Sequence, residues 1–487
     1  MLLTAELLFY FQRCNRRAFL EVYGDRTQQD PQSDYLGKLL QDSAAHQNRV
    51  LADYDYQSPL YSPSHWQAGA EATREMMRQG ASCIHRGVLL VPTQASSSIS
   101  LLGVPDLLIK QPGESEFGDW HYVPTIIRLG KRPKFDYQII AAFHAFLLLS
   151  IQGTMPQAAG LELRDRRFYS VNLHKVLPQL EARLHACLEM LDARLEPEVF
   201  ISRQRCNLCN WLSSCKQVAQ SQNHLSLIAG VTPTRYQSLQ ALGVTTVELL
   251  AQSHPQYLEG EIEPEVAAQL VVQAQAVLQN QAIAKSQPLP NDLPVSEVEL
   301  YFDIEAEPEL NLDYLLGVLV VDRRSQTQVF HPFLAPHPDA ESQIWQQFLE
   351  LVESYPDAPI FHFCDYEVKA TRQLAKRYST PRQRWEPLLK RFVDIHERVT
   401  RLAILPVEGY ALKAIARWMG FEWQDSSANG AQCIYWYDCW LKTGNSQYLE
   451  AIVRYNQDDC LATHRVKEWL VQYFLPTHFS RGDRLTP

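Results

Sequence analysis

The sequence lacks any uninterrupted apolar run approaching the roughly 18 residues of a membrane-spanning helix. It also lacks a small-residue cleavage site near its N-terminus, where Met1–Leu8 leads directly to the charged Arg13, Arg16 and Arg17. Positive charge is not in excess, because 45 Lys and Arg face 55 Asp and Glu, giving a net charge of −10. A global basic field is therefore absent, and any nucleic-acid binding must come from local patches. We expect a cytoplasmic protein with no membrane partner.

What the chain does contain is ordinary globular sequence, with 46% hydrophobic residues and neither internal repeats nor low-complexity tracts. Its 487 residues suggest about three domains. The Pro-rich stretch 286–294 predicts a linker, and residues 221–295 predict a helical connector. Within the connector, Leu242–Leu250 is similar to helix-hairpin-helix modules, which either contact a phosphate backbone or serve only as connectors. We therefore predict a multidomain α/β protein with domains at 1–220, 221–295 and 296–487.

The first domain combines a predicted sheet with a cysteine cluster. Residues 87–92, 99–110 and 122–129 predict consecutive strands, and 137–149 predict an apolar helix. The first twenty residues predict one amphipathic helix that carries Cys14. Much later, Cys206, Cys209 and Cys215 form a C-x2-C-x5-C pattern, which is typical of metal ligands. The alternatives are three unligated thiols for the late group and a small buried apolar side chain for Cys14.

This arrangement resembles the RecB-like branch of the PD-(D/E)xK nucleases, which have a restriction-endonuclease-like α/β fold. Several of those enzymes join one early cysteine to three late ones with an iron–sulfur cluster. The resemblance implies that Cys14, Cys206, Cys209 and Cys215 form one site. Four thiolates suit a 4Fe–4S cluster, with Zn²⁺ as the alternative.

The catalytic part of that family pattern is incomplete in this chain. Asp106 in Gly103–Asp106 matches the metal-binding aspartate, but the expected acid-x-Lys falls at Ile126 and Arg128. No carboxylate occurs from Trp120 to Phe135. We therefore expect this domain to have lost its own nuclease chemistry. The basic residues that follow either grip phosphates or form only a solvated turn; they are Arg128, Lys131, Arg132 and Lys134.

The last domain carries an ordered set of acidic residues. Asp303 and Glu305 occupy positions i and i+2 of a predicted strand, so their side chains project from the same face. Residues 314–322 and 327–333 predict two further strands, which completes an antiparallel meander. Glu367 opens a later helix, and Tyr455 and Asp459 are at i and i+4 on the final helix, hence on one face. Adjacent carboxylates repel each other unless a hard cation such as Mg²⁺ lies between them.

This order resembles the DnaQ-like 3′–5′ exonucleases of the Tyr-containing subclass and a bacterial ribonuclease H-like family, over about 190 residues. The resemblance implies an RNase H-like fold and a site for two Mg²⁺ or Mn²⁺ ions. Its ligands would be Asp303, Glu305, Glu367 and Asp459, with Tyr455 orienting the attacking water. The family usually has Asp where this chain has Glu367, so Asp365 is an alternative ligand. Asp394 is a weaker candidate on another strand.

Two functions follow from these patterns. The first is a metal-dependent 3′–5′ exonuclease that hydrolyses phosphodiester bonds at single-stranded DNA or RNA ends, in repair, recombination or processing. The second is a non-catalytic nucleic-acid-binding module that serves a helicase or a nuclease. A third interpretation, in which the first domain cleaves with relocated catalytic residues, predicts cleavage that depends on Asp106 instead of Asp303.

Overall fold

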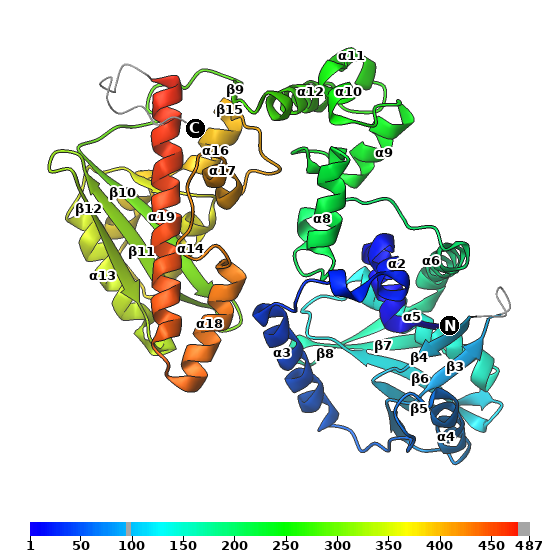
Figure 1. Cartoon of the computed structure of the whole chain (residues 1–487). Coiled ribbons are helices and arrows are strands. Elements are labelled where there is room, and N and C mark those ends of the chain that lie inside the picture. Colours follow the sequence, from blue (N-terminus) through cyan, green and yellow to red (C-terminus); the bar gives the residue numbers. More distant parts are fainter. Residues whose placement is uncertain (94–98, 476–487) are drawn as a thin grey trace. The chain divides into compact units, whose positions relative to one another are not determined.

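The computed structural model describes residues 1–93 and 99–475, which form two compact units, Met1–Val218 and Ala219–Pro487 (Figure 1). Both units combine helices with sheets that contain parallel and antiparallel pairs. The predicted mixed α/β fold class is therefore confirmed. The division into three domains stays a prediction, and the connector lies in the same unit as the last domain.

The first unit contains two sheets. The larger has the order β2-β5-β6-β7-β8, and the smaller has the order β1-β4-β3. The strands of the larger sheet are β2 Cys83–His85, β5 Leu107–Ser115, β6 Gly118–Ile127, β7 Ala158–Leu163 and β8 Arg167–Asn172. Those of the smaller are β1 Leu2–Thr4, β3 Leu89–Pro92 and β4 Ser100–Gly103. The predicted strand 99–110 is wrong in one respect, because it is two strands in different sheets, interrupted where Pro105 offers no backbone N–H.

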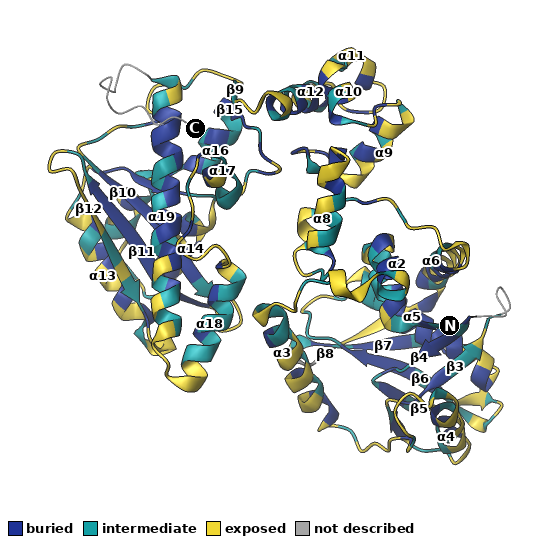
Figure 2. Cartoon of the chain, viewed as in Figure 1, coloured by how far each residue is buried: buried dark blue, intermediate teal, exposed yellow. Residues whose placement is uncertain are grey.

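Helix α5, Phe135–Gln152, packs against strands of both sheets and against α1 and α6. By length and composition α5 could cross a membrane, but 61% of it is buried inside the fold. Figure 2 colours the ribbon of this unit by burial. The helix ends at Gly153, whose positive φ of 71° suits glycine. The other α-helices are α1 Ala5–Arg13, α2 Asn15–Tyr23, α3 Asp34–Leu51, α4 Trp66–Arg78, α6 Leu173–Ala193, α7 Arg203–Cys206 and α8 Leu212–Ser221.

The single helix predicted for the first twenty residues is wrong. Residues 2–4 form β1, which pairs in parallel with β4, and the following helix breaks at Cys14. Cys14 has an extended backbone, and its Sγ accepts a hydrogen bond from the backbone N–H of Arg17, which caps α2. A capping thiol interrupts the helix without changing its apolar periodicity, so the pattern alone could not reveal the break.

The second unit begins with short helices that are joined to the last domain by specific bonds. These helices are α9 Pro233–Ala241, α10 Val247–Gln252, α11 Pro255–Leu258 and α12 Pro264–Gln279. Gln273 of α12 donates through Nε2 to the carbonyl of Leu405 at 2.6 Å. Strand β9 (Ile283–Ala284) pairs with β15 (Ala403–Ile404). In the predicted linker, Asp292 forms ion pairs with Arg398 and Arg401.

The main sheet of the second unit has the order β12-β11-β10-β13-β14. Strands β10 (Val298–Glu307), β11 (Leu312–Asp322) and β12 (Thr327–Leu334) form the predicted antiparallel meander. Strands β13 (Ile360–His362) and β14 (Phe392–Asp394) are parallel to β10. The α-helices that follow the meander are α13 Glu341–Glu353, α14 Tyr366–Arg377, α15 Arg382–Leu389, α16 Ile395–Leu402, α17 Leu412–Trp418, α18 Gly430–Thr443 and α19 Gln447–Phe474.

The long helix α19 packs against β10 and β11 and is mostly buried on that side (Figures 1 and 2). One end of this contact contains a buried charge network. Lys467 and Glu299 are both 0% exposed and form an ion pair of 2.6 Å. Arg323 adds a second cation 3.1 Å from Glu299. Because an unpaired buried charge is strongly unfavourable, this network fixes how α19 lies on the sheet.

Candidate metal centre

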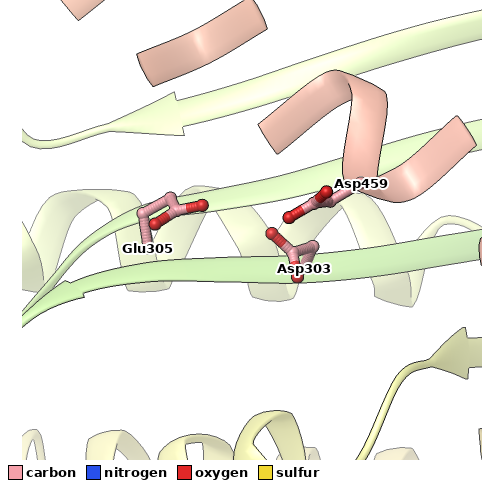
Figure 3. A group of neighbouring side chains, drawn as sticks. All are labelled: Asp303, Glu305 and Asp459. Atoms are coloured by element: carbon pink, nitrogen blue, oxygen red, sulfur yellow. The ribbon is translucent and has the colours of Figure 1, made fainter. Parts of the chain in front are cut away.

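Three carboxylates converge where α19 crosses β10. Ligand oxygens of Asp303, Glu305 and Asp459 all lie within 4.8 Å of one another. Figure 3 shows that Asp303 and Asp459 face each other, while Glu305 lies farther along the strand that carries Asp303. The strand places two of the acids and the helix places the third, as the alternation of the strand and the position of Asp459 predicted.

Burial raises the pKa values of all three carboxyl groups, and repulsion by the neighbouring acids raises those of Asp303 and Glu305 further. For Asp303 the pKa is raised well above its usual range by burial first, and then by the charges of Asp459, Glu305 and Glu367. The pKa of Glu305 is raised well above its usual range by burial, Asp459 and Glu367. Burial raises the pKa of Asp459 to about 7. A cation shared by these oxygens would remove the repulsion.

Glu367 lies beside this group, and its charge contributes to the raised pKa values of Asp303 and Glu305. It is 3% exposed, and its Oε2 lies 3.4 Å from Nδ1 of His362. It is not one of the three residues whose oxygens meet within 4.8 Å. The alternative, Asp365, is exposed and pairs with Lys369 one turn along the helix. The structure therefore places Glu367, and not Asp365, next to the three acids.

Asp394, the weaker candidate, is engaged in shaping the local backbone. Its Oδ1 accepts hydrogen bonds from the backbone N–H groups of Cys364 (3.0 Å) and Glu397 (3.2 Å). The second bond caps α16, and the first holds Cys364 in a left-handed conformation, with φ of 74°. Such a conformation is unusual for a residue other than glycine. Asp394 thus positions the turn that leads to Glu367.

Tyr455 and Trp423 both contact Asp459. The indole Nε1 of Trp423 donates to Oδ1 of Asp459 at 2.7 Å, and the nearby Tyr455 hydroxyl lowers the pKa of the same carboxyl group. The pKa of Tyr455 is raised far beyond its usual value by burial and then by Asp459, Glu305 and Asp303. The phenol therefore stays protonated and can donate a hydrogen bond, but it cannot act as a base near neutral pH.

Lys413 supplies a positive charge on the same side. Its Nζ lies 5.3 Å from the ring centres of both Trp423 and Tyr455, and it donates to the carbonyl of Ala428. Burial lowers the pKa of Lys413, while the negative charge of Asp459 opposes that shift. Sequence reasoning missed Lys413 and Trp423 because both belong to the segment before α18, and only the fold brings that segment to Asp459.

Two more residues near the site were not anticipated. Asn456 donates through Nδ2 to Oδ2 of Asp303 at 2.6 Å. Cys433 is the second: its thiol lies near Glu305 and lowers the pKa of that carboxyl group. The position of Asn456 directly after Tyr455 was the available signal. It became informative only once the face of α19 toward β10 was known.

The four cysteines predicted to form a cluster line one cavity of the first unit. Arg13, Arg16, Arg17 and Arg205 line the same cavity and place positive charge beside the thiols. Burial raises the pKa values of Cys206, Cys209 and Cys215, and the neighbouring Cys14 raises them further. In the described part of the chain, no three of these sulfurs lie within 4.8 Å of one another. The structure thus brings together all four predicted residues, at wide spacing.

The carboxylate of Asp106 is paired with a positively charged side chain of the protein itself. Oδ2 of Asp106 lies 3.3 Å from Nη1 of Arg128 and accepts the backbone N–H of Ile127 at 2.7 Å. Oδ1 accepts from Gln47 at 3.3 Å. Both oxygens of Asp106 are therefore already engaged.

Comparison with known families agrees with the fold of the last domain. No curated protein matches the chain. Residues 300–471 match the family model described as the RNase_H superfamily. The matched segment contains Asp303, Glu305, Glu367, Tyr455 and Asp459. The C-terminal part of this chain is therefore an RNase H-like domain, of a superfamily that usually hydrolyses phosphodiester bonds in nucleic acids.

Proposed function

We propose that this protein is a metal-dependent 3′–5′ exonuclease whose chemistry takes place in the RNase H-like domain. The observation that carries the proposal is the convergence of Asp303, Glu305 and Asp459 within 4.8 Å beside a buried tyrosine. Such a group of carboxylates is expensive to bury without a cation. The superfamily match adds the expectation of phosphodiester chemistry, and the Tyr-x3-Asp arrangement adds the exonuclease subclass.

The residues fit two Mg²⁺ or Mn²⁺ ions. Carboxylate oxygens are the ligands that these hard cations prefer. The buried hydroxyl of Tyr314, whose pKa is raised by burial and then by the charge of Glu305, has no hydrogen-bond partner within the described protein. Buried polar atoms are nearly always partnered, so this region fits bound ions and their water. Asp303, Glu305 and Asp459 would hold the ions directly, with Glu367 beside them.

When bound, the ions would stabilise developing charge on the phosphoryl group and make a bound water more acidic. The protein residues have separate roles. Trp423 orients the Asp459 carboxylate by donating to it. Tyr455 stays protonated, so it orients water by a hydrogen bond instead of deprotonating it. The Lys413 ammonium offsets part of the negative charge that nucleic acid would bring to the site.

The cysteine cavity supports a second part of the proposal, a 4Fe–4S cluster held by Cys14, Cys206, Cys209 and Cys215. A single tetrahedral Zn²⁺ with Zn–S bonds of about 2.3 Å would hold its four sulfurs roughly 3.8 Å apart. The wider spacing of the described thiols favours a larger group over a single zinc ion. The surrounding arginines would balance the negative charge of a thiolate-bound cluster.

A nucleic-acid-binding role for the first unit is supported by the Asp106–Arg128 pair. This pair neutralises the carboxylate without a metal ion. Lys131, Arg132 and Lys134 are exposed in the loop that follows β6 and are available to phosphates. We propose that this unit binds the nucleic acid, for this chain or for a helicase partner, while the RNase H-like domain cleaves it.

Cleavage assays with the purified full-length chain test the proposal. Single-stranded DNA and RNA are labelled at the 5′ end in one series and at the 3′ end in another, and incubated with Mg²⁺ or Mn²⁺. We expect the wild type to give a ladder from the 5′ label and released mononucleotide from the 3′ label. Asp303→Ala should abolish both products, because it removes one of the three converging carboxylates.

Asp106→Ala is the matched control, since it removes an acid from the first unit and should leave cleavage intact. Cleavage lost in Asp106→Ala but retained in Asp303→Ala would assign the chemistry to the first unit. Absence of shortening by the wild type in every condition would overturn the exonuclease. Retained nucleic-acid binding in that case would favour a non-catalytic binding module.

A further inference from the structure

Asn456 makes a contact to the metal centre that the proposed chemistry does not yet use. It lies on α19, one residue after Tyr455 and three before Asp459, and is 0% exposed. Its Nδ2 donates to Oδ2 of Asp303 at 2.6 Å. The helix that supplies Asp459 therefore also holds the carboxylate on the facing strand. A neutral amide donor can stabilise that carboxylate without competing for a cation.

A glycine on β11 makes room for this contact. Gly317 is the direct cross-strand partner of Asp303. A Cβ atom at position 317 would lie 1.6 Å from Oδ1 and 2.8 Å from Cγ of Asn456. No side chain can occupy that space while Asn456 stays in place. Glycine within a strand weakens it, so its presence between buried β-branched and leucine residues is explained by this close approach.

The orientation of the Asn456 amide follows from its two neighbours. Turning the amide over would point Oδ1 at a carboxylate oxygen 2.6 Å away, which is repulsive. With the amide as placed, Oδ1 is buried and has no hydrogen-bond partner within the described protein. The residue thus tolerates an unsatisfied acceptor in order to donate to Asp303. A side chain present only to fill space would favour an apolar residue of the same volume.

We infer that Asn456 is a positioning residue that fixes Asp303 for divalent-cation binding, and that Gly317 is required for this role. The inference rests on the proposed metal centre. Oδ2 of Asp303 is committed to Asn456, so Oδ1 would be the oxygen left for a cation. Hydrogen bonds to ionised groups are stronger than neutral ones, and this bond lies in a buried environment. Loss of such an outer contact typically weakens metal affinity by about 10–100-fold.

Mn²⁺ binding to the full-length chain without nucleic acid tests the inference. The protein is first stripped with a chelator, and free Mn²⁺ is then followed by electron paramagnetic resonance during titration. We expect Asn456→Ala and Gly317→Ala each to weaken Mn²⁺ binding by about 10–100-fold. Both substitutions disrupt the contact between Asn456 and Asp303, one from α19 and the other from β11. The double variant should therefore bind no more weakly than Asn456→Ala alone, because the added methyl group then meets no amide.

Arg454→Ala changes an exposed residue of α19 and should bind Mn²⁺ like the wild type. Thermal unfolding of each variant shows whether it is folded, and Gly317→Ala serves if Asn456→Ala is not. Equal Mn²⁺ affinity of the wild type and a folded Asn456→Ala would overturn the positioning role but leave the metal centre intact. Failure of the wild type to bind Mn²⁺ would overturn the metal centre, and this inference with it.

Discussion

The clustered acids make the charge state of single residues decisive. In the metal-free protein, burial and like charges raise the pKa values of Asp303, Glu305 and Asp459. A carboxyl group whose pKa is raised by folding stabilises the fold below its unfolded pKa, which is about 4. That stabilisation is lost as the pH rises toward the folded pKa, which is about 7 for Asp459. Metal-free protein should therefore weaken between roughly pH 4 and 7.

Asp303→Asn should relieve this effect, because it removes one of the repelling charges. With a chelator present, we expect the variant to gain stability over the wild type as the pH rises, by up to about 1.4 kcal/mol per pH unit. Melting temperatures at pH 5, 6, 7 and 8 would measure the difference. Added Mg²⁺ should raise the melting temperature of the wild type more at pH 8 than at pH 5. A difference that stays constant with pH would show that Asp303 titrates normally in the fold.

At this scale, sequence alone identified the acids but not their partners. Asp303, Glu305 and Asp459 follow from strand alternation and from their place on the final helix. Asn456, Lys413 and Trp423 carry no such signal, because their importance depends on which segments the fold brings to Asp303 and Asp459. The position of Glu367 could be predicted only in part. Its place at the start of a helix was predictable, but its separation from the other three acids depends on the turn held by Asp394.

At the scale of elements, the position of α19 is fixed at one end by the Lys467–Glu299 pair. Burial would raise the pKa of Glu299, but Lys467 and Arg323 outweigh it, so the pKa is lowered and Glu299 stays charged. Lys467→Met would leave Glu299 with Arg323 as its remaining cation. We expect a loss of about 3 kcal/mol in the free energy of unfolding, measured by urea denaturation.

The exposed pair of Lys369 with Asp365 offers a matched control. Lys369→Met should change the free energy of unfolding by less than about 1 kcal/mol, because solvent screens that pair. Adding Glu299→Gln to Lys467→Met should recover part of the lost stability, since Glu299 then no longer leaves a buried charge without Lys467. Equal losses for Lys467→Met and Lys369→Met would contradict the role assigned to the buried network.

Among the elements, those with strong periodicity were predictable and the short ones were not. The meander β10–β12 and the helix α13 follow from their apolar patterns. Strand β1 spans three residues and gains its partner, β4, from nearly a hundred residues away. The break at Cys14 depends on a thiol that caps a helix. The local sequence pattern predicts neither the long-range pairing of β1 with β4 nor the cap at Cys14.

For the whole molecule, the cysteine cavity predicts a spectroscopic property of the first unit. Anaerobic purification should give protein with the visible absorbance of an iron–sulfur chromophore and with bound iron. Cys209→Ser should lose most of that absorbance, because a complete cluster requires four thiolates. Cys439→Ser, a half-buried cysteine of the other unit, should retain it. Bound zinc without visible absorbance would indicate a single-metal site and contradict the iron–sulfur cluster.

The pairing of Asp106 with Arg128 also constrains how the first unit could change by mutation. Ile126, where a metal-binding acid would be needed, is 0% exposed on β6. Glu introduced there alone would bury a charge with no ion to meet it, while removal of Arg128 alone would leave Asp106 without its cation. Each single step is therefore unfavourable. A metal site beside Asp106 would therefore require both changes together, which places a mutational barrier before this unit.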